Sequence, residues 1–290
     1  MSLGSFPWQV LIVIGVVLVS IGQVISKYQV HRAASLQVLV YKYLASVVLI
    51  WFLWKLSDYS LPSQWWMFIG YGMITGFNVV LYTLASRISL SKTTMTAPVN
   101  QILGILFAAI LLNEWRLFNL HSQGGIQLMT ALFLVPLLFY LLHEKIGKTS
   151  EKWTIYMTIY VIAVAGLRVL AKIFLYSVEP IQLLSLQYIG SLVIIILGIK
   201  WRQHKFYIGK KFAVLGLTQG VFNSLGILLF LSALKQSSVT QTSLLRMPLF
   251  IVLTTSAGLL GFKEIKDMTR KKWLGMLVAL GITVLMLTAN

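Results

Sequence analysis

Four basic residues interrupt apolar stretches of the sequence, where each would lie at the depth of a membrane. They are Lys42, Arg168, Lys172 and Arg246. An ionisable group at that depth is costly and marks a functional site by default. The acids map instead to the ends of the apolar stretches or between them; they are Asp58, Glu114, Glu144, Glu151, Glu179, Glu264 and Asp267. An anionic substrate is one way to compensate the four cations.

Further polar and aromatic side chains recur at helical spacing and could line one central cavity with these cations. One series is Tyr71, Thr75, Asn78 and Tyr82, a second is Gln219, Asn223, Gly226 and Phe230, and a third sets Thr96, Asn100 and Gln101 opposite Ser243 and Arg246. Tyr43 and Tyr188 are deep enough to stack on a substrate. The predicted substrate-binding residues are Arg168, Arg246, Lys42, Lys172, Gln23, Tyr43, Asn78, Tyr82, Asn100, Tyr188, Gln219 and Asn223.

Each of these residues also has a purely structural interpretation. Lys27, Lys42 and Lys172 could extend along their helices to the lipid headgroups, and the arginines could do the same or bind helix-end carbonyls. Asparagine and glutamine inside apolar helices also act as hydrogen-bonding links between helices. Glu114 and Glu264, at the ends of apolar stretches, are interpreted as helix caps or loop ion pairs, with gating as the alternative.

Motifs for enzymatic chemistry are missing from the sequence. The four histidines are scattered without metal-ligand spacing, and the chain contains no cysteine. It has no glycine-rich phosphate loop and no nucleophile elbow. We therefore expect no enzymatic activity, no metal and no cofactor, and gradient coupling, exchange or facilitated diffusion in place of ATP-driven transport.

The elements that must position these residues are membrane-spanning helices. The chain of 290 residues is 58% hydrophobic and 11% charged, whereas soluble domains are about 25% charged. Ten stretches are long enough to cross a bilayer; they are 8–27, 36–54, 65–86, 95–112, 124–142, 154–176, 181–199, 212–234, 239–262 and 273–289. The net charge of +17 comes mostly from the short loops between them, which argues against nucleic-acid binding.

The two halves of the chain repeat each other. Pro98 and Glu114 have the same spacing as Pro248 and Glu264, at an offset of 150 residues that Gly125 and Gly275 share. An offset of 145 pairs Lys27 with Lys172, Tyr43 with Tyr188, Ser46 with Ser191 and Lys55 with Lys200, and an offset of 148 pairs Ala85 with Ala233 and Ser89 with Ser237. Residues 1–145 and 150–290 are therefore predicted to be repeats of five spans each. Five is an odd number, so the second repeat is inverted, as in carriers whose substrate binds between the halves.

These features resemble the drug/metabolite transporter superfamily, and within it the ten-span EamA-type transporters. The resemblance rests on an Ala-x-x-x-Ser at the end of the third span of each half, a Pro in the fourth, a Glu sixteen residues later and a Gly opening the fifth. It implies an all-α membrane fold with two inverted five-helix repeats. The family's second span often carries an arginine near its start, and this sequence has Lys42 and Gln187 there.

Loop charge predicts the orientation in the membrane. Seventeen Lys and Arg residues lie in the loops after the first, third, fifth, seventh and ninth spans; only Lys55, Arg116 and Lys235 lie in the other loops. The positive-inside rule then places both termini outside the cytoplasm, whereas the family resemblance implies termini inside. We expect a carrier in a cell membrane, the bacterial inner or plasma membrane, working among lipids as a monomer or homodimer.

The expected function is to move a small organic metabolite, preferably an anion, by alternating access. Two alternatives remain open from the sequence. One is an exporter of neutral or zwitterionic amino acids or aromatic compounds, in which the arginines bond within the protein. The other is a lipid scramblase or flippase, in which the cations hold headgroup phosphates.

Overall fold

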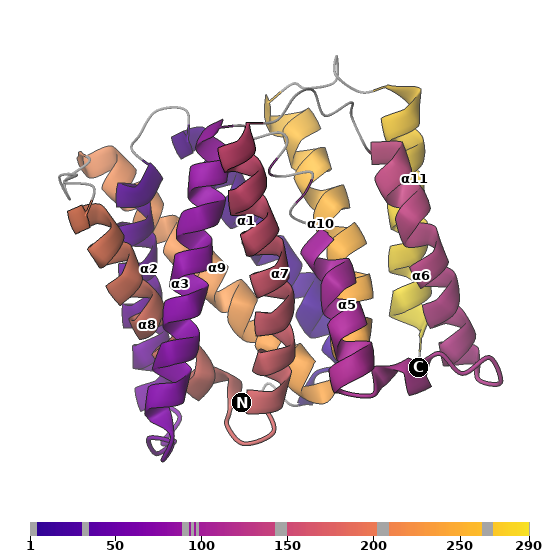
Figure 1. Ribbon diagram of the computed structural model, residues 1–290, viewed down its shortest axis with the longest axis horizontal. Coiled ribbons are helices and arrows are strands. Elements are labelled where there is room, and N and C mark those ends of the chain that lie inside the picture. Colours follow the sequence, from indigo (N-terminus) through magenta and orange to yellow (C-terminus); the bar gives the residue numbers. More distant parts are fainter. Residues whose placement is uncertain are drawn as a thin grey trace.

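The computed structural model confirms an all-α fold with one helix at each predicted span (Figure 1). It describes residues 5–30, 35–88, 93, 96, 99–142, 150–201, 209–262 and 269–289, with the side chains of 27–30, 35 and 258–262 excluded. Pro98, Ser89 and Glu264 lie outside the described residues, as does the side chain of Lys27. The helices are α1 (Trp8–Val30), α2 (Ser35–Lys55), α3 (Trp65–Ile88), α5 (Val99–Leu111), α6 (Gln123–Leu142), α7 (Glu151–Phe174), α8 (Pro180–Trp201), α9 (Lys210–Gln236), α10 (Val239–Phe262) and α11 (Arg270–Thr288).

Eight of these helices are long and apolar enough to cross a membrane by length and composition. The other two are α5, described over 13 residues, and α10, whose first half carries Arg246 among several Ser, Thr and Gln residues. A short 3₁₀ helix, η2 (Glu114–Leu117), occupies the α5–α6 connection, where the sequence predicts the end of a span. The described part of the chain contains no strand.

Each helix packs mainly on helices of the other half, as expected for two equivalent halves related by two-fold symmetry. Helix α1 packs on α9 and α10, and its counterpart α7 packs on α3 and α5. Likewise α2 packs on α9, and α8 packs on α3. The pairs α2–α8, α5–α10 and α6–α11 each join a helix to its own counterpart, and Figure 1 shows α6 and α11 side by side at one end of the bundle. This pattern is that of a pseudo-two-fold axis between the halves.

The start of α1 and the end of α11 lie on one face of the bundle, where Gln9 donates a hydrogen bond of 3.3 Å to the carbonyl of Ala289. We call this the terminal face. Successive helices alternate in direction, so α7 runs opposite to α1 (Figure 1). The second half is therefore inverted relative to the first.

Two equivalent serine hydrogen bonds join the halves at close helix crossings. Ser46 on α2 donates to the carbonyl of Gly220 on α9 at 3.2 Å, and Ser191 on α8 donates to the carbonyl of Gly72 on α3 at 2.8 Å. A β-carbon at either glycine would collide with the facing backbone. Glycine therefore lets α2 meet α9, and α8 meet α3, closely enough for a side chain to reach the opposite backbone.

Candidate functional site

Arg168 is buried, and neutral acceptors from two other helices bind three of the five N–H groups of its guanidinium. Its guanidinium donates to the side chains of Gln101 and Asn100 on α5 and of Ser243 on α10, the latter two at 3.2 Å. Gly104 on α5 leaves room for this contact, because a β-carbon there would lie 3.4 Å from the Arg168 Nη1 atom. Arg168 therefore links α7 to α5 and α10, one helix from the first half and one from the second.

Lys172, one turn further along α7, binds the end of α9. Its ammonium donates to the carbonyls of Leu234, Lys235 and Ser237 at 2.8, 3.3 and 2.7 Å. These carbonyls lie at a helix C-terminus, where a cation interacts favourably with the helix dipole. The ammonium has only three protons to donate, so Lys172 has no donor left for a substrate.

Glu114 binds the other side of the same α9–α10 corner. Its two carboxylate oxygens accept from the backbone N–H groups of Val239 and Thr240, both at 2.8 Å. An acid at a helix N-terminus satisfies free donors and complements the dipole. The interpretation of Glu114 as a helix cap is confirmed. Lys172 and Glu114 thus both bind backbone groups where α9 ends and α10 begins, and we call these two sets of contacts the corner clasp.

Arg246 has surroundings opposite to those of Arg168. It is half-buried, although five of the six residues from Thr242 to Met247 are buried. Its guanidinium lies over the ring of Phe230 on α9, 4.3 Å from the ring centroid, in cation–π geometry. Among the described residues its guanidinium has no hydrogen-bond acceptor and no ion-pair partner. Arg246 is therefore a partly accessible cation in an otherwise buried stretch of α10.

Among the four cations predicted at membrane depth, Lys42 is the second whose charged group has no acceptor among the described residues. It precedes buried Ser46 by one helical turn, and its own carbonyl contacts Gly220, so it lies on the side of α2 that faces α9. Its Nζ atom is 5.8 Å from the ring centroid of Tyr43, near the limit for a cation–π interaction. Its counterpart in the second half, Gln187, is uncharged and has a buried side-chain oxygen without a partner.

Tyrosines occupy the space between the halves. Tyr43 and Tyr188 are counterparts in the repeat and pack edge to face across the α2–α8 contact, with centroids 5.5 Å apart. Tyr82 on α3 packs on Tyr160 on α7 at 5.1 Å. Tyr160 lies close enough to Arg168 and Arg246 to interact electrostatically with both.

The remaining predicted residues are amides on α1, α3 and α9. Gln219 and Asn223 are buried beside Gly22 on α1, and Gln23 next to that glycine is half-buried. Asn78 is buried, donates to the carbonyl of Ile74 in its own helix at 3.0 Å and leaves its side-chain oxygen unpaired. The hydroxyl of Tyr188 is likewise buried without a hydrogen-bond partner.

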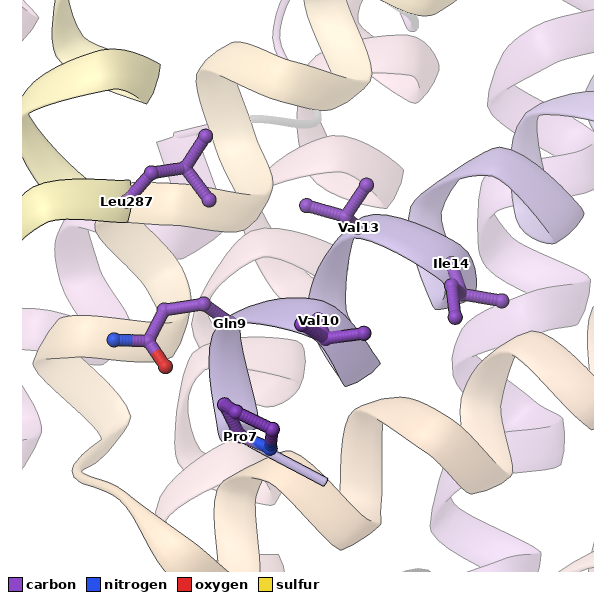
Figure 2. Close-up of a pocket in the computed structure, with 6 residues that line it drawn as sticks. All are labelled: Pro7, Gln9, Val10, Val13, Ile14 and Leu287. Carbon is purple, nitrogen blue, oxygen red and sulfur yellow. The ribbon is translucent and has the colours of Figure 1, made fainter.

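Two open grooves on the bundle contain none of the predicted residues. One, of about 400 Å³, lies between the start of α1 and the end of α11. Figure 2 shows the side chains around it, of which Gln9 is the polar one. The other, of about 560 Å³, runs between α2 and α8 and has Lys55 at its edge. Apolar grooves of this kind suit lipid chains and contribute nothing to the cation site.

Two residues of the central region, Tyr160 and Gln187, are absent from the set predicted from the sequence. The repeat offered a signal for both. Tyr160 stands at the offset where the first half has Gly15, which packs tightly on Gly226 of α9. Gln187 stands where the first half has Lys42. Differences between matched positions of the two halves mark the places where the site is asymmetric.

Comparisons with known proteins support the interpretation of the chain as a membrane transporter. Residues 151–288 match the model of the EamA-like transporter family, a range that nearly coincides with the predicted second repeat. A solved structure titled "Crystal structure of protein" aligns over 98% of this chain and 99% of that chain with a TM-score of 0.77 and 10% sequence identity, which shows a shared fold. No curated protein matches the sequence. Over residues 151–288 this multi-pass membrane protein therefore matches the EamA-like transporter family of the drug/metabolite transporter superfamily.

Proposed function

We propose that this transporter moves a small organic anion across the bacterial plasma membrane by alternating access, and that Arg246 is its main contact with the anion. One observation carries the proposal. Arg246 is a half-buried arginine whose guanidinium lies over the ring of Phe230 and has no hydrogen-bond acceptor or ion-pair partner among the described residues. An acidic group on a bound molecule would supply the missing acceptor.

The contrast with Arg168 supports this choice between the two arginines. Three neutral acceptors from α5 and α10 already bind the Arg168 guanidinium. Both protons of its Nη1 atom are engaged, so an acid that binds across Nη1 and Nη2 would have to displace an acceptor. Arg246 needs no such displacement, and its planar fork fits a carboxylate or phosphate with two parallel hydrogen bonds. Arg168 then positions α10, the helix that carries Arg246, through its bond to Ser243.

The arrangement of the helices supports alternating access as the mechanism. Helix α1 of the first half packs on α9 and α10 of the second half, and α7 of the second half packs on α3 and α5 of the first. Arg246 lies on α10, one of the helices that join the two halves. A rocking motion that tightens one set of contacts and loosens the other would expose the site to each side of the membrane in turn.

Binding measurements on the purified full-length protein test the proposal. A library of organic anions and their neutral analogues is screened by thermal shift, because a ligand that binds the folded state raises its melting temperature. Arg246→Gln removes the charge and Arg246→Lys keeps it. We expect Arg246→Gln to weaken anion binding roughly 10- to 100-fold, the effect of losing a hydrogen bond to a charged group, with a smaller loss for Arg246→Lys.

Lys55→Gln is the control, because Lys55 is exposed at the end of α2. It removes a positive charge without touching the central region and should leave anion binding unchanged. Tightest binding of neutral or zwitterionic compounds, together with unchanged affinity in Arg246→Gln, would reject the proposal in favour of the neutral-substrate alternative. Movement of labelled phospholipid in reconstituted vesicles without any bound metabolite would favour the lipid-handling alternative.

A further inference from the structure

The cations inside the bundle divide into two groups by their partners. Lys172 and Arg168 each have three hydrogen-bond acceptors within the protein. Lys42 and Arg246 have none among the described residues, and each is half-buried with an aromatic ring beside it. A cation in that condition is unfavourable unless water or a bound anion compensates it.

The two unpaired cations come from opposite halves of the molecule. Lys42 lies on α2 and Arg246 on α10, and their counterparts in the repeat, Gln187 and Thr96, are uncharged. The duplication therefore does not account for either charge. Each half contributes one positive group, and the two helices that carry them are not counterparts. The repeat in the sequence therefore does not place the two charges relative to each other.

Both cations lie beside α9. The backbone carbonyl of Lys42 contacts Gly220 on that helix, and the Arg246 guanidinium lies over the ring of Phe230 on the same helix. Gly220 and Phe230 are ten residues apart, a rise of about 15 Å along an α-helix. Lys42 and Arg246 thus meet α9 at two separate points.

No acid in the described part of the protein is placed to neutralise either end. The described acids Asp58, Glu114, Glu151 and Glu179 all lie at helix ends or in the turns between helices, and Glu114 and Glu179 already have partners. Two separated cations beside one helix fit an elongated molecule that has an acidic group at each end.

Building on the function proposed above, we propose that the substrate carries two separated anionic groups, one bound by Arg246 and the other by Lys42. The class comprises dicarboxylates and acids with one carboxylate and one phosphate or phosphonate. Arg246 supplies a bidentate guanidinium, and Lys42 supplies a flexible point charge that adapts to the length of the molecule.

Matched pairs of ligands test the proposal on the full-length protein in detergent or nanodiscs. The probes are succinate, glutarate, adipate and pimelate, their monoamides, and the phosphonocarboxylates of the same lengths. Each monoamide keeps the length of its parent and lacks one charge. We expect the preferred dianion to bind at least about tenfold more tightly than its monoamide, with an optimum length because the two cations are held by helices.

Lys42→Gln is the decisive variant, because its counterpart Gln187 already shows that a glutamine is accommodated at this point of the repeat. It should abolish the preference for the dianion over its monoamide while binding of the monoamide continues. Lys42→Arg should retain the preference. Melting temperatures of the unliganded variants show whether each one is folded.

Outcomes for the two proposals differ. Equal affinity of dianions and monoamides, or an unchanged preference in Lys42→Gln, overturns this inference while Arg246 still binds a single anion. If Arg246→Gln alters no anion affinity at all, the proposed function fails and this inference fails with it.

Discussion

Arg168 and Arg246 are the same amino acid with opposite surroundings. Both interrupt apolar helices, and sequence alone treats them alike. The Arg168 guanidinium donates hydrogen bonds to the side chains of Asn100, Gln101 and Ser243. Arg246 meets the face of Phe230. Since the acceptors come from α5 and α10, only the packing of three helices reveals which arginine has hydrogen-bond acceptors within the protein.

Lys172 illustrates the structural use of a buried charge. Its three acceptors are carbonyls at the end of α9 that have no partner within the helix. We predict that Lys172→Met destabilises the protein by about 1–3 kcal/mol, because it leaves buried acceptors unsatisfied. The measurement is the melting temperature of the purified protein in detergent.

Lys235→Met is the matched control for this prediction. Lys235 lies near the same corner, but its ion pair with Glu179 at 2.6 Å is well exposed. Exposed pairs contribute about 0–1 kcal/mol, so the control should melt close to the wild type. If both variants melt at the same temperature, the corner clasp does not stabilise the fold.

The candidate site was partly predictable from the sequence. An ionisable side chain in an apolar run is visible without a structure, and so is the mismatch of Lys42 with Gln187 or of Arg246 with Thr96 between the repeats. The acceptor of each cation was not predictable. Leu234 and Ser237 bind Lys172 through backbone carbonyls, and any residue type has a carbonyl, so no sequence pattern identifies them.

Helices α2, α3, α8 and α9 approach each other through duplicated glycine contacts. Gly220 faces the backbone of Lys42, and Gly72 faces the backbone of Gln187. Each contact sits beside the serine hydrogen bond that joins the same two helices. These crossings fix the position of α2, and hence the place of Lys42 and Tyr43 relative to α9.

We predict that Gly72→Ala and Gly220→Ala each destabilise the protein by about 1–3 kcal/mol, the usual cost of overpacking a tight contact. The added methyl group would meet backbone atoms, which cannot rotate away. Thermal unfolding monitored by intrinsic fluorescence is a suitable measurement.

The same substitution at an open position serves as the control. A β-carbon added to Gly198 on α8 would have no neighbouring atom within 4 Å, and Ala has the higher helix propensity. Gly198→Ala should therefore be neutral or stabilising. Equal losses at Gly72, Gly220 and Gly198 would mean that close crossing is not the reason for glycine at the first two positions.

In the described helix bundle, the start of α1 and the end of α11 lie on one face, and the helices that precede the most basic stretches of the sequence end at the opposite face. Gln9 and Ala289 meet at the terminal face, and the turn that precedes α3 lies on that same face because the helices alternate. Loop charge predicts that the terminal face points away from the cytoplasm.

Cysteine labelling tests this orientation directly, because the natural sequence contains no cysteine. Gln64→Cys places a thiol at the exposed turn before α3, and Lys152→Cys places one at the exposed start of α7. In intact cells a membrane-impermeant maleimide should label the first and spare the second. Both should react after permeabilisation, and the reverse pattern in intact cells would show that the termini are cytoplasmic.

The sequence by itself determined the membrane class and the positions of the ten helices to within a few residues, and it predicts a division into two repeats. These features depend on local hydrophobicity and on spacing along the chain, and both can be read from one sequence. Only the tertiary structure decided which groups surround Arg168, Lys172, Glu114 and Arg246. A charged side chain acts according to the groups that surround it, and here those groups come from helices far apart in the sequence.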